Sequence, residues 1–133
     1  MTNSGREKGS SMVGLGIDAV DVARFRSLLA RRPGISRRLF TEDERAYAAR
    51  LADPAPSLAA RFAAKEATMK ALGVGVGAFR WCDVEVRRAE GGRPSLLLRG
   101  QAAALAGRHG VESWQVSLTH TASVAGAVVA ALS

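Results

Sequence analysis

The side chains of this sequence that could do chemistry are two carboxylates, a lysine and a histidine. Glu66 and Lys70 stand four residues apart in a run of strong helix formers, which places them one turn apart on one helix face. Asp18 ends an alternating segment, and His120 lies between two apolar segments. Two carboxylates without a cysteine or histidine partner suit Mg²⁺, which proteins usually hold with one or two carboxylates and substrate phosphates. The chemistry predicted is phosphoryl or nucleotidyl transfer, catalysed by positioning and charge neutralisation.

Each of these residues also has a structural interpretation, and the residues alone leave the choice open. Glu66 and Lys70 could form a solvated ion pair worth about 0.3–0.5 kcal/mol. Asp18 could cap the helix that follows it. His120 could be a satisfied residue where two core strands meet, although hydroxyl groups around it favour a pocket that holds an anion. These hydroxyls belong to Ser117, Thr119, Thr121 and Ser123.

The composition restricts the class of protein. The chain has 133 residues, of which 47% are hydrophobic and 23% charged, and this predicts one soluble globular domain. Its net charge is +7, and its 19 basic residues are 16 arginines and 3 lysines. The excess predicts an anionic partner, which could be nucleic acid, a phosphorylated cofactor or an acidic protein. A basic nucleic-acid-binding protein without catalysis is disfavoured, because aromatic residues make up only 5% and do not interleave with basic ones.

Cysteine usage and hydropathy predict a cytoplasmic protein without a membrane partner. Cys82 is the single cysteine of the sequence, so an intrachain disulfide is excluded. The sequence has two histidines, His109 and His120, and with one cysteine these are too few for a Cys/His zinc site. No apolar run reaches the roughly 20 residues that span a bilayer. Residues 1–11 are polar and lack the apolar segment of a secretory signal. We expect them to be a disordered extension, native or left from expression, before a folded domain over residues 12–133.

The glycines before Asp18 predict a close contact with another part of the protein. Gly14 and Gly16 share one side of the segment 13–18 with Asp18, and alternate glycines in a strand usually mark the close approach of a ligand or backbone. The helix of Glu66 carries a face of small residues. These are Ala63, Ala67 and Ala71. We expect this helix to lie against the strand with Asp18, in the same or a neighbouring subunit.

The pattern as a whole predicts an α+β fold, with a mostly antiparallel sheet and packed helices. We expect Arg61 and Lys65 to project beside Glu66. We expect residues 81–88 to form a half-exposed strand, with Val84 and Glu85 on opposite sides. Further strands are expected at 13–18, 95–99, 113–119 and 123–131. Helices are expected at 19–32 and 100–110. A third helix should start at a capping box of Thr41 and Glu44 and run to about residue 51. A rigid linker at 53–56 should lead to a fourth helix, which is capped by Ser57 and ends at Gly73.

Five segments in this order resemble the signature of holo-acyl-carrier-protein synthases, the short-chain class of 4′-phosphopantetheinyl transferases. The segments are Gly16-Ile17-Asp18 with Arg24, Arg61-Phe62-Ala63-Ala64-Lys65-Glu66-Ala67 with Lys70-Ala71-Leu72-Gly73, Trp81-Cys82-Asp83-Val84-Glu85-Val86, Gly92-Arg93-Pro94, and Ser117-Leu118-Thr119-His120. The resemblance covers the chain from about Val13 to its end. It implies a single transferase-like unit that forms a homotrimer, with active sites between neighbouring subunits.

The resemblance implies a reaction and its residues. Coenzyme A would donate its 4′-phosphopantetheine arm to a serine of an apo acyl carrier protein, and 3′,5′-ADP would leave, in fatty-acid or polyketide biosynthesis. Asp18 and Glu66 would hold Mg²⁺ against the pyrophosphate, and Glu66 would help to deprotonate the serine. Lys70 would stabilise phosphate charge and protonate the leaving group. The positions that match the nucleotide site are Arg61, Lys70, Gly92, Arg93, Pro94, Thr119 and His120, and those that match the carrier-protein docking surface are Arg24, Arg26 and Arg31.

Two positions depart from the wider pattern. The longer transferases carry an acid where this chain has Val20, so water would have to supply more of the metal's ligands. Some short members carry an acid after the motif histidine, where this chain has Thr121. The general base therefore stays open between Glu66, a water on the metal and His120. A coenzyme A-binding module without catalysis is disfavoured, because the predicted catalytic residues are all present.

Overall fold

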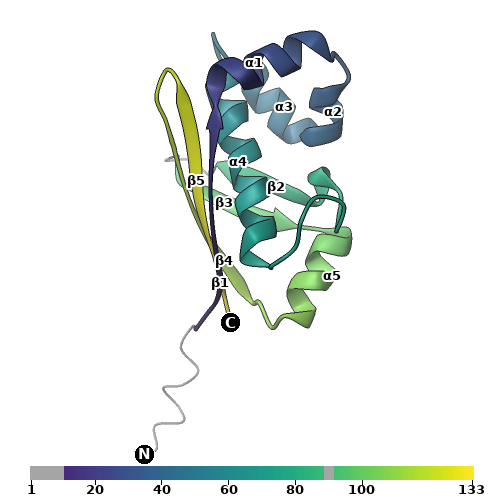
Figure 1. Cartoon of the computed structure of the whole chain (residues 1–133). Coiled ribbons are helices and arrows are strands. Elements are labelled where there is room, and N and C mark those ends of the chain that lie inside the picture. The colour runs from purple at the N-terminus through teal and green to yellow at the C-terminus, as the bar shows by residue number, and fades with distance from the viewer. Residues whose placement is uncertain (1–10, 89–91) are drawn as a thin grey trace, which may run out of the picture.

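A long helix, α4, packs along one face of a three-stranded antiparallel sheet, and a two-stranded hairpin lies on another side of the helix (Figure 1). The computed structural model describes residues 11–88 and 92–133. The elements are β1 (Met12–Asp21), α1 (Val22–Arg31), α2 (Ile35–Leu39), α3 (Glu42–Ala49), α4 (Ala55–Ala71), the 3-10 helix η2 (Trp81–Asp83), β2 (Val84–Arg88), β3 (Pro94–Leu98), α5 (Gly100–Arg108), β4 (Ser113–His120) and β5 (Val124–Leu132). The predicted α+β class is confirmed. The predicted disordered segment lies outside the described residues except for Ser11.

The two sheets are purely antiparallel in the described residues. The larger has the order β1-β5-β4, and the smaller is the hairpin β2-β3. Helices α1, α2 and α3 gather at one end of α4, and α5 lies near its other end (Figure 1). No helix in the described part of the chain is long and apolar enough to cross a membrane.

The glycines of β1 allow α4 to touch the strand with its backbone. A Cβ atom at Gly16 would lie 1.8 Å from the Ala67 carbonyl oxygen, and one at Gly14 would lie 1.9 Å from that of Ala71. Any side chain at these positions would therefore push the helix away. The predicted close approach is confirmed, and it is made by the helix of the same chain.

Several element boundaries differ from expectation, and the sheet register and capping explain the differences. β1 continues to Asp21, which caps α1 by accepting a hydrogen bond from the Ala23 amide at 3.1 Å, so Asp18 does not cap that helix. Val20 consequently lies in a strand. α4 begins at Ala55, before the expected cap at Ser57, because proline is well tolerated in a first helical turn. The second half of the expected rigid linker, residues 55–56, is thus the start of α4.

The hairpin is confirmed, but one of its residues differs from expectation. Residues 81–83 form the 3-10 helix, and the strand is shorter than predicted. Glu85 is only 2% exposed, although the alternation predicts that it faces water. Its carboxylate pairs with Arg87 at 2.6 Å and with Arg99 at 3.4 Å, and this pairing compensates for the burial of its charge.

The sheet face turned away from α4 exposes several apolar side chains. Ile17 is 65% exposed, Leu15 56% and Val128 40%, and Ile17 pairs directly with Val128 in the β1–β5 register. No helix of the described residues covers this face (Figure 1). We call it the open sheet face. β5 was expected to be well buried, and it is buried on the α4 side only.

Candidate active site

Asp18, Glu66 and Lys70 meet where α4 crosses β1, and we call these three residues the carboxylate cluster. The Lys70 ammonium donates to Asp18 Oδ1 at 3.0 Å and to the carbonyl oxygen of Ile17 at 3.0 Å. The Asp18 side chain is 17% exposed and that of Lys70 is 56% exposed. The structure therefore brings together the three residues that the sequence predicts for metal and phosphate chemistry.

The two carboxyl groups of the cluster are close enough to share a hydrogen bond, and their pKa values move apart. Burial, together with the hydrogen bond and negative charge of Asp18, raises the pKa of Glu66 to about 8, although Lys70 partly offsets this. Burial opposes the ionisation of Asp18 too, but hydrogen bonds with Glu66 and Lys70 outweigh it, and the pKa of Asp18 is lowered. In the absence of a cation, one proton between the two groups relieves their repulsion. A divalent cation can replace that proton.

The donor set of the cluster fits a hard cation. It offers two carboxyl groups, and oxygen donors of this kind bind Mg²⁺. The described residues contain no group of three or more acidic, histidine or cysteine side chains that could surround a metal. A cation held by Asp18 and Glu66 would therefore complete its coordination with water and phosphate oxygens.

The expectation that Arg61 and Lys65 project beside Glu66 is wrong. Lys65 is fully buried and pairs with Glu44 at 2.8 Å, towards the core side of α4. The Arg61 guanidinium lies 4.3 Å from the centre of the Tyr47 ring. Arg61 and Glu66 are five residues apart, which separates them by about 140° around the helix. Lys70 is therefore the cation of α4 that lies beside the Asp18 and Glu66 carboxyl groups.

Arg61 lines a small cavity. Its side chain is buried, and its Nε atom has no hydrogen-bond partner among the described residues. Burial lowers the pKa of Arg61, and the negative charge of Glu44 partly offsets this. The cavity has a volume of about 250 Å³ and contains two further arginines, which the sequence did not single out. Its lining residues are Asp43, Tyr47, Arg61, Glu85, Val86, Arg87 and Arg88.

Arg93 and Pro94 line another cavity, at the edge of β4. Its volume is about 470 Å³, and we call it the β4-edge cavity. Its other lining residues are Arg88, Gln115, Val116, Ser117, Leu118, Val128 and Ala130. Several of them belong to the open sheet face, so this cavity opens towards that face. Arg88 and Gln115 carried no signal in the sequence, because only the fold brings them beside Arg93.

Thr119 and His120 end β4 and are exposed. Asp18 pairs with Ala127 of β5, whereas His120 pairs with Ala125 on the other edge of that strand. β5 therefore separates the histidine from the carboxylate cluster within one chain. The hydroxyl of Thr121 does not serve a pocket, because it accepts hydrogen bonds from the Ser123 and Val124 amides at 3.2 and 3.0 Å in the turn.

The three arginines of α1 differ in their availability. Arg24 forms no ion pair among the described residues, whereas Arg26 makes two hydrogen bonds to Asp53, at 2.7 and 3.1 Å. Arg31 Nε donates to the Ser27 carbonyl oxygen at 3.4 Å. Arg24 is therefore the α1 cation most available to an acidic partner.

Comparison with known proteins agrees with this geometry. The model of the 4′-phosphopantetheinyl transferase superfamily matches residues 14–130. A holo-[acyl-carrier-protein] synthase from Frankia casuarinae is 54% identical over 121 residues, which cover 91% of this chain and 98% of that protein. One from Streptomyces avermitilis is 50% identical over 121 residues, with the same coverage.

Solved structures show the same fold. Holo-[acyl-carrier-protein] synthase from Neisseria meningitidis matches with a TM-score of 0.83 at 26% identity, over 91% of this chain and 98% of that one. The Helicobacter pylori synthase in complex with coenzyme A matches with a TM-score of 0.78 at 29% identity, over 90% and 99%. The chain therefore belongs to the 4′-phosphopantetheinyl transferase superfamily, as one of its holo-[acyl-carrier-protein] synthases.

Proposed function

We propose that this enzyme transfers the 4′-phosphopantetheine arm of coenzyme A to a serine of an apo acyl carrier protein, with Mg²⁺ as cofactor and 3′,5′-ADP as the other product. The observation that carries the proposal is the meeting of Asp18 and Glu66 with the Lys70 ammonium 3.0 Å from Asp18. Relatives crystallised with coenzyme A support the donor. The physiological pathway would be fatty-acid or polyketide biosynthesis in the cytoplasm.

The residues of the carboxylate cluster would have different roles in the reaction. Asp18 and Glu66 would hold Mg²⁺, which supplies neutralisation of the pyrophosphate charge when bound. The serine oxygen attacks the phosphorus that carries the pantetheine arm, and the bond from that phosphorus to the bridging oxygen of 3′,5′-ADP breaks. Glu66 takes the serine proton. Lys70 protonates the leaving phosphate or stabilises its negative charge. Glu66 is favoured as the base over His120, because β5 separates His120 from the cluster within one chain.

The nucleotide site would be completed by a neighbouring subunit. Arg61, Arg93 and His120 lie away from the carboxylate cluster of their own chain, as do Gly92, Pro94 and Thr119. The open sheet face exposes Ile17 and other apolar side chains, and uncovered apolar patches of this kind mark interfaces between proteins. Packing of this face in a homotrimer would bring the β4-edge cavity of one subunit to the cluster of the next.

The carrier protein would dock on α1. Arg24 is free of ion pairs in the described part of the chain, and Arg31 lies two helical turns further on the same side. Arg26 would contribute only after it exchanges its bonds to Asp53 for bonds to the partner. An acidic helix is the complementary partner for this surface, and charge complementarity mainly raises the rate of encounter.

Mass spectrometry of a panel of apo carrier proteins tests this function. Incubation with coenzyme A, Mg²⁺ and the enzyme should add about 340 Da to at least one of them, the mass of the transferred arm. Replacement of the acceptor serine of that carrier protein by alanine should abolish the gain. No gain on any carrier protein would overturn the proposal.

A further inference from the structure

Lys65 precedes Glu66 in the chain, yet it is held on a different side of α4 by three acceptors. Its ammonium lies 2.8 Å from Glu44 Oε1, and it donates to the carbonyl oxygens of Trp81, at 3.1 Å, and Val84. An ammonium has three N–H donors, so these three acceptors occupy all of them. The side chain is 0% exposed, and its nitrogen is fixed from three directions.

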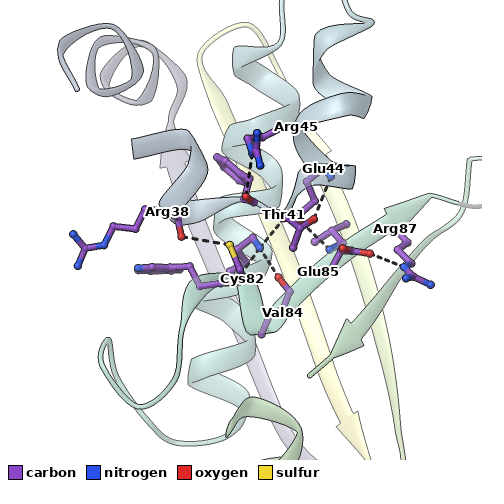
Figure 2. A network of polar contacts seen from close by, with 12 residues as sticks. Arg38, Thr41, Glu44, Arg45, Cys82, Val84, Glu85 and Arg87 are labelled. Carbon is purple, nitrogen blue, oxygen red and sulfur yellow. Dashed lines mark hydrogen bonds and ion pairs between the residues drawn. The ribbon is translucent and has the colours of Figure 1, made fainter. Parts of the chain in front are cut away.

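Glu44 links this lysine to two further elements. Its Oε1 atom accepts from the Thr41 amide at 2.9 Å, which is the capping box of α3, and its Oε2 atom accepts from the Val86 amide at 2.8 Å, in β2. Figure 2 shows Thr41 and Glu44 above the strand that carries Val84 and Glu85. A buried polar network therefore joins α3, α4 and β2.

On the side of α4 that faces β1, the directional contacts given by the structure are those of Lys70, a 56% exposed side chain that donates to Asp18 and to the Ile17 carbonyl oxygen. The packing itself is made by Ala67 and Ala71 against the glycines of β1, and such small residues form shallow ridges. Close contact sets the distance between helix and strand, whereas rotation needs a directional restraint. On a helix with a side-chain radius of about 5–6 Å, a rotation of roughly 10° moves a side-chain tip by about 1 Å.

We propose that Lys65 is a positioning residue for the transfer reaction: its bonds to Glu44 and β2 hold α4 at the rotation that brings Glu66 to Asp18. Lys65 and Glu66 are consecutive, about 100° apart on the helix, so neither can rotate without the other. A displacement of about 1 Å by a change remote from the chemistry can lower a rate by about 100-fold. The geometric part of the proposal rests on the contacts alone, and its catalytic consequence rests on the proposed function.

A buried ion pair need not stabilise a fold, because the cost of removing both charges from water offsets their attraction. Loss of stability alone would therefore be a weak test. The informative property is the geometry of the carboxylate cluster, which the affinity for a metal ion reports directly. Mn²⁺ alone, titrated by electron paramagnetic resonance, measures that affinity without the transfer reaction.

The test compares a charge-removing variant with a packing variant of the same helix. Glu44→Gln combined with Lys65→Met removes both charges and leaves neither unpaired. Leu58→Ala is the matched control, because Leu58 is a buried residue of α4 that belongs to another part of the core. The double variant should bind Mn²⁺ at least about 10-fold more weakly and lose about 100-fold in kcat, with the KM for the carrier protein little changed. Leu58→Ala should melt at a lower temperature and keep both properties.

The following results would contradict the positioning role or the proposed function. A folded double variant with wild-type Mn²⁺ affinity and kcat overturns the positioning role, and so do equal losses in Leu58→Ala. If the double variant does not fold, Glu44→Asp replaces it, because it keeps the charge but withdraws the carboxylate by one methylene. Mn²⁺ affinity should then fall, and an unchanged affinity overturns the proposal. A wild-type protein that binds Mn²⁺ but transfers nothing contradicts the proposed function and leaves the Mn²⁺ comparison valid.

Discussion

Asp18 and Glu66 are both carboxylic acids, yet their surroundings assign them different protonation states. The Lys70 ammonium touches Asp18, whereas partial burial and the charge of Asp18 oppose the ionisation of Glu66. Neighbouring groups whose pKa values are driven apart commonly divide acid and base roles. Asp18 is therefore the permanent anion, and Glu66 is the group that can exchange a proton near neutral pH.

The raised pKa of Glu66 predicts how the stability of the metal-free protein depends on pH. The folded state keeps a proton on Glu66 up to a pKa of about 8, whereas the unfolded chain releases it near 4.5. The folded state thus binds more protons between these values, and the free energy of unfolding should fall as pH rises from about 4.5 to 8. The lowered pKa of Asp18 acts in the opposite direction and only at more acidic pH.

Urea unfolding in EDTA at pH 5 and pH 8 measures this effect. Glu66→Gln cannot titrate, so it should lose the part of the pH dependence that belongs to this group. Equal pH dependence in wild type and variant would show that Glu66 is ionised throughout. Mg²⁺ affinity should rise with pH up to about 8, because the metal displaces the shared proton.

At the scale of single elements, local signals in the sequence predict that α4, the hairpin and the capping box of α3 exist, but not where α4 and the first hairpin strand begin. The carboxylate cluster was also predictable, because Glu66 and Lys70 must share a helix face. The orientation of Arg61 and Lys65 was not, since it depends on which side of α4 meets the sheet. The choice between Asp18 and Asp21 as helix cap depends on where β1 ends, which pairing with β5 decides.

The contact of α4 with β1 predicts a cost for any side chain at Gly16. Gly16→Ala should force the helix away from the strand, because its Cβ would lie 1.8 Å from the Ala67 carbonyl oxygen. We expect a loss of about 1–3 kcal/mol in the free energy of unfolding, together with reduced activity from displacement of Glu66. Gly75→Ala is the control, because a Cβ at Gly75 would meet nothing within 4 Å. Equal stability of the two variants in urea would contradict the close contact.

The exposed α1 helix predicts a selective effect on the carrier protein. Arg24→Glu should raise the KM for the carrier protein several-fold and leave the KM for coenzyme A nearly unchanged, because it reverses charge only at the docking surface. Arg108→Glu makes the same charge change on α5, which lies at the other end of the molecule (Figure 1). Steady-state kinetics with each substrate varied separately would measure both effects. A similar rise for both substrates, or for both variants, would remove the docking role of α1.

At the scale of the whole molecule, one chain holds the two halves of the proposed site apart. The carboxylate cluster lies where α4 meets β1, and the β4-edge cavity lies across the sheet at its other edge. The sequence predicts Asp18 and Glu66 in one half and Arg93 in the other, but it gives no signal for Arg88 and Gln115. Only the fold, with its strand order β1-β5-β4, brings these two residues to the cavity. The apolar open sheet face supports assembly as the way in which the two halves meet.

Mixing two inactive variants tests this composite site. Glu66→Gln disables the cluster, and Arg93→Glu disables the cavity, so each homo-oligomer should be inactive. After co-refolding at equal amounts, about one site in four should combine an intact cluster with an intact cavity from the neighbour. Activity should return to roughly that fraction of wild type. A mixture as inactive as its components would place each site within one subunit.

Magnesium-dependent transfer by the carboxylate cluster is tested most directly by the mass of an apo carrier protein incubated with coenzyme A and the enzyme. We expect a gain of about 340 Da with Mg²⁺ and none in EDTA. Glu66→Gln should slow the gain by at least about 100-fold. Glu42→Gln, a change at an exposed acid of α3, should not slow it. Transfer at the full rate in EDTA, or by Glu66→Gln, would contradict the role of the cluster.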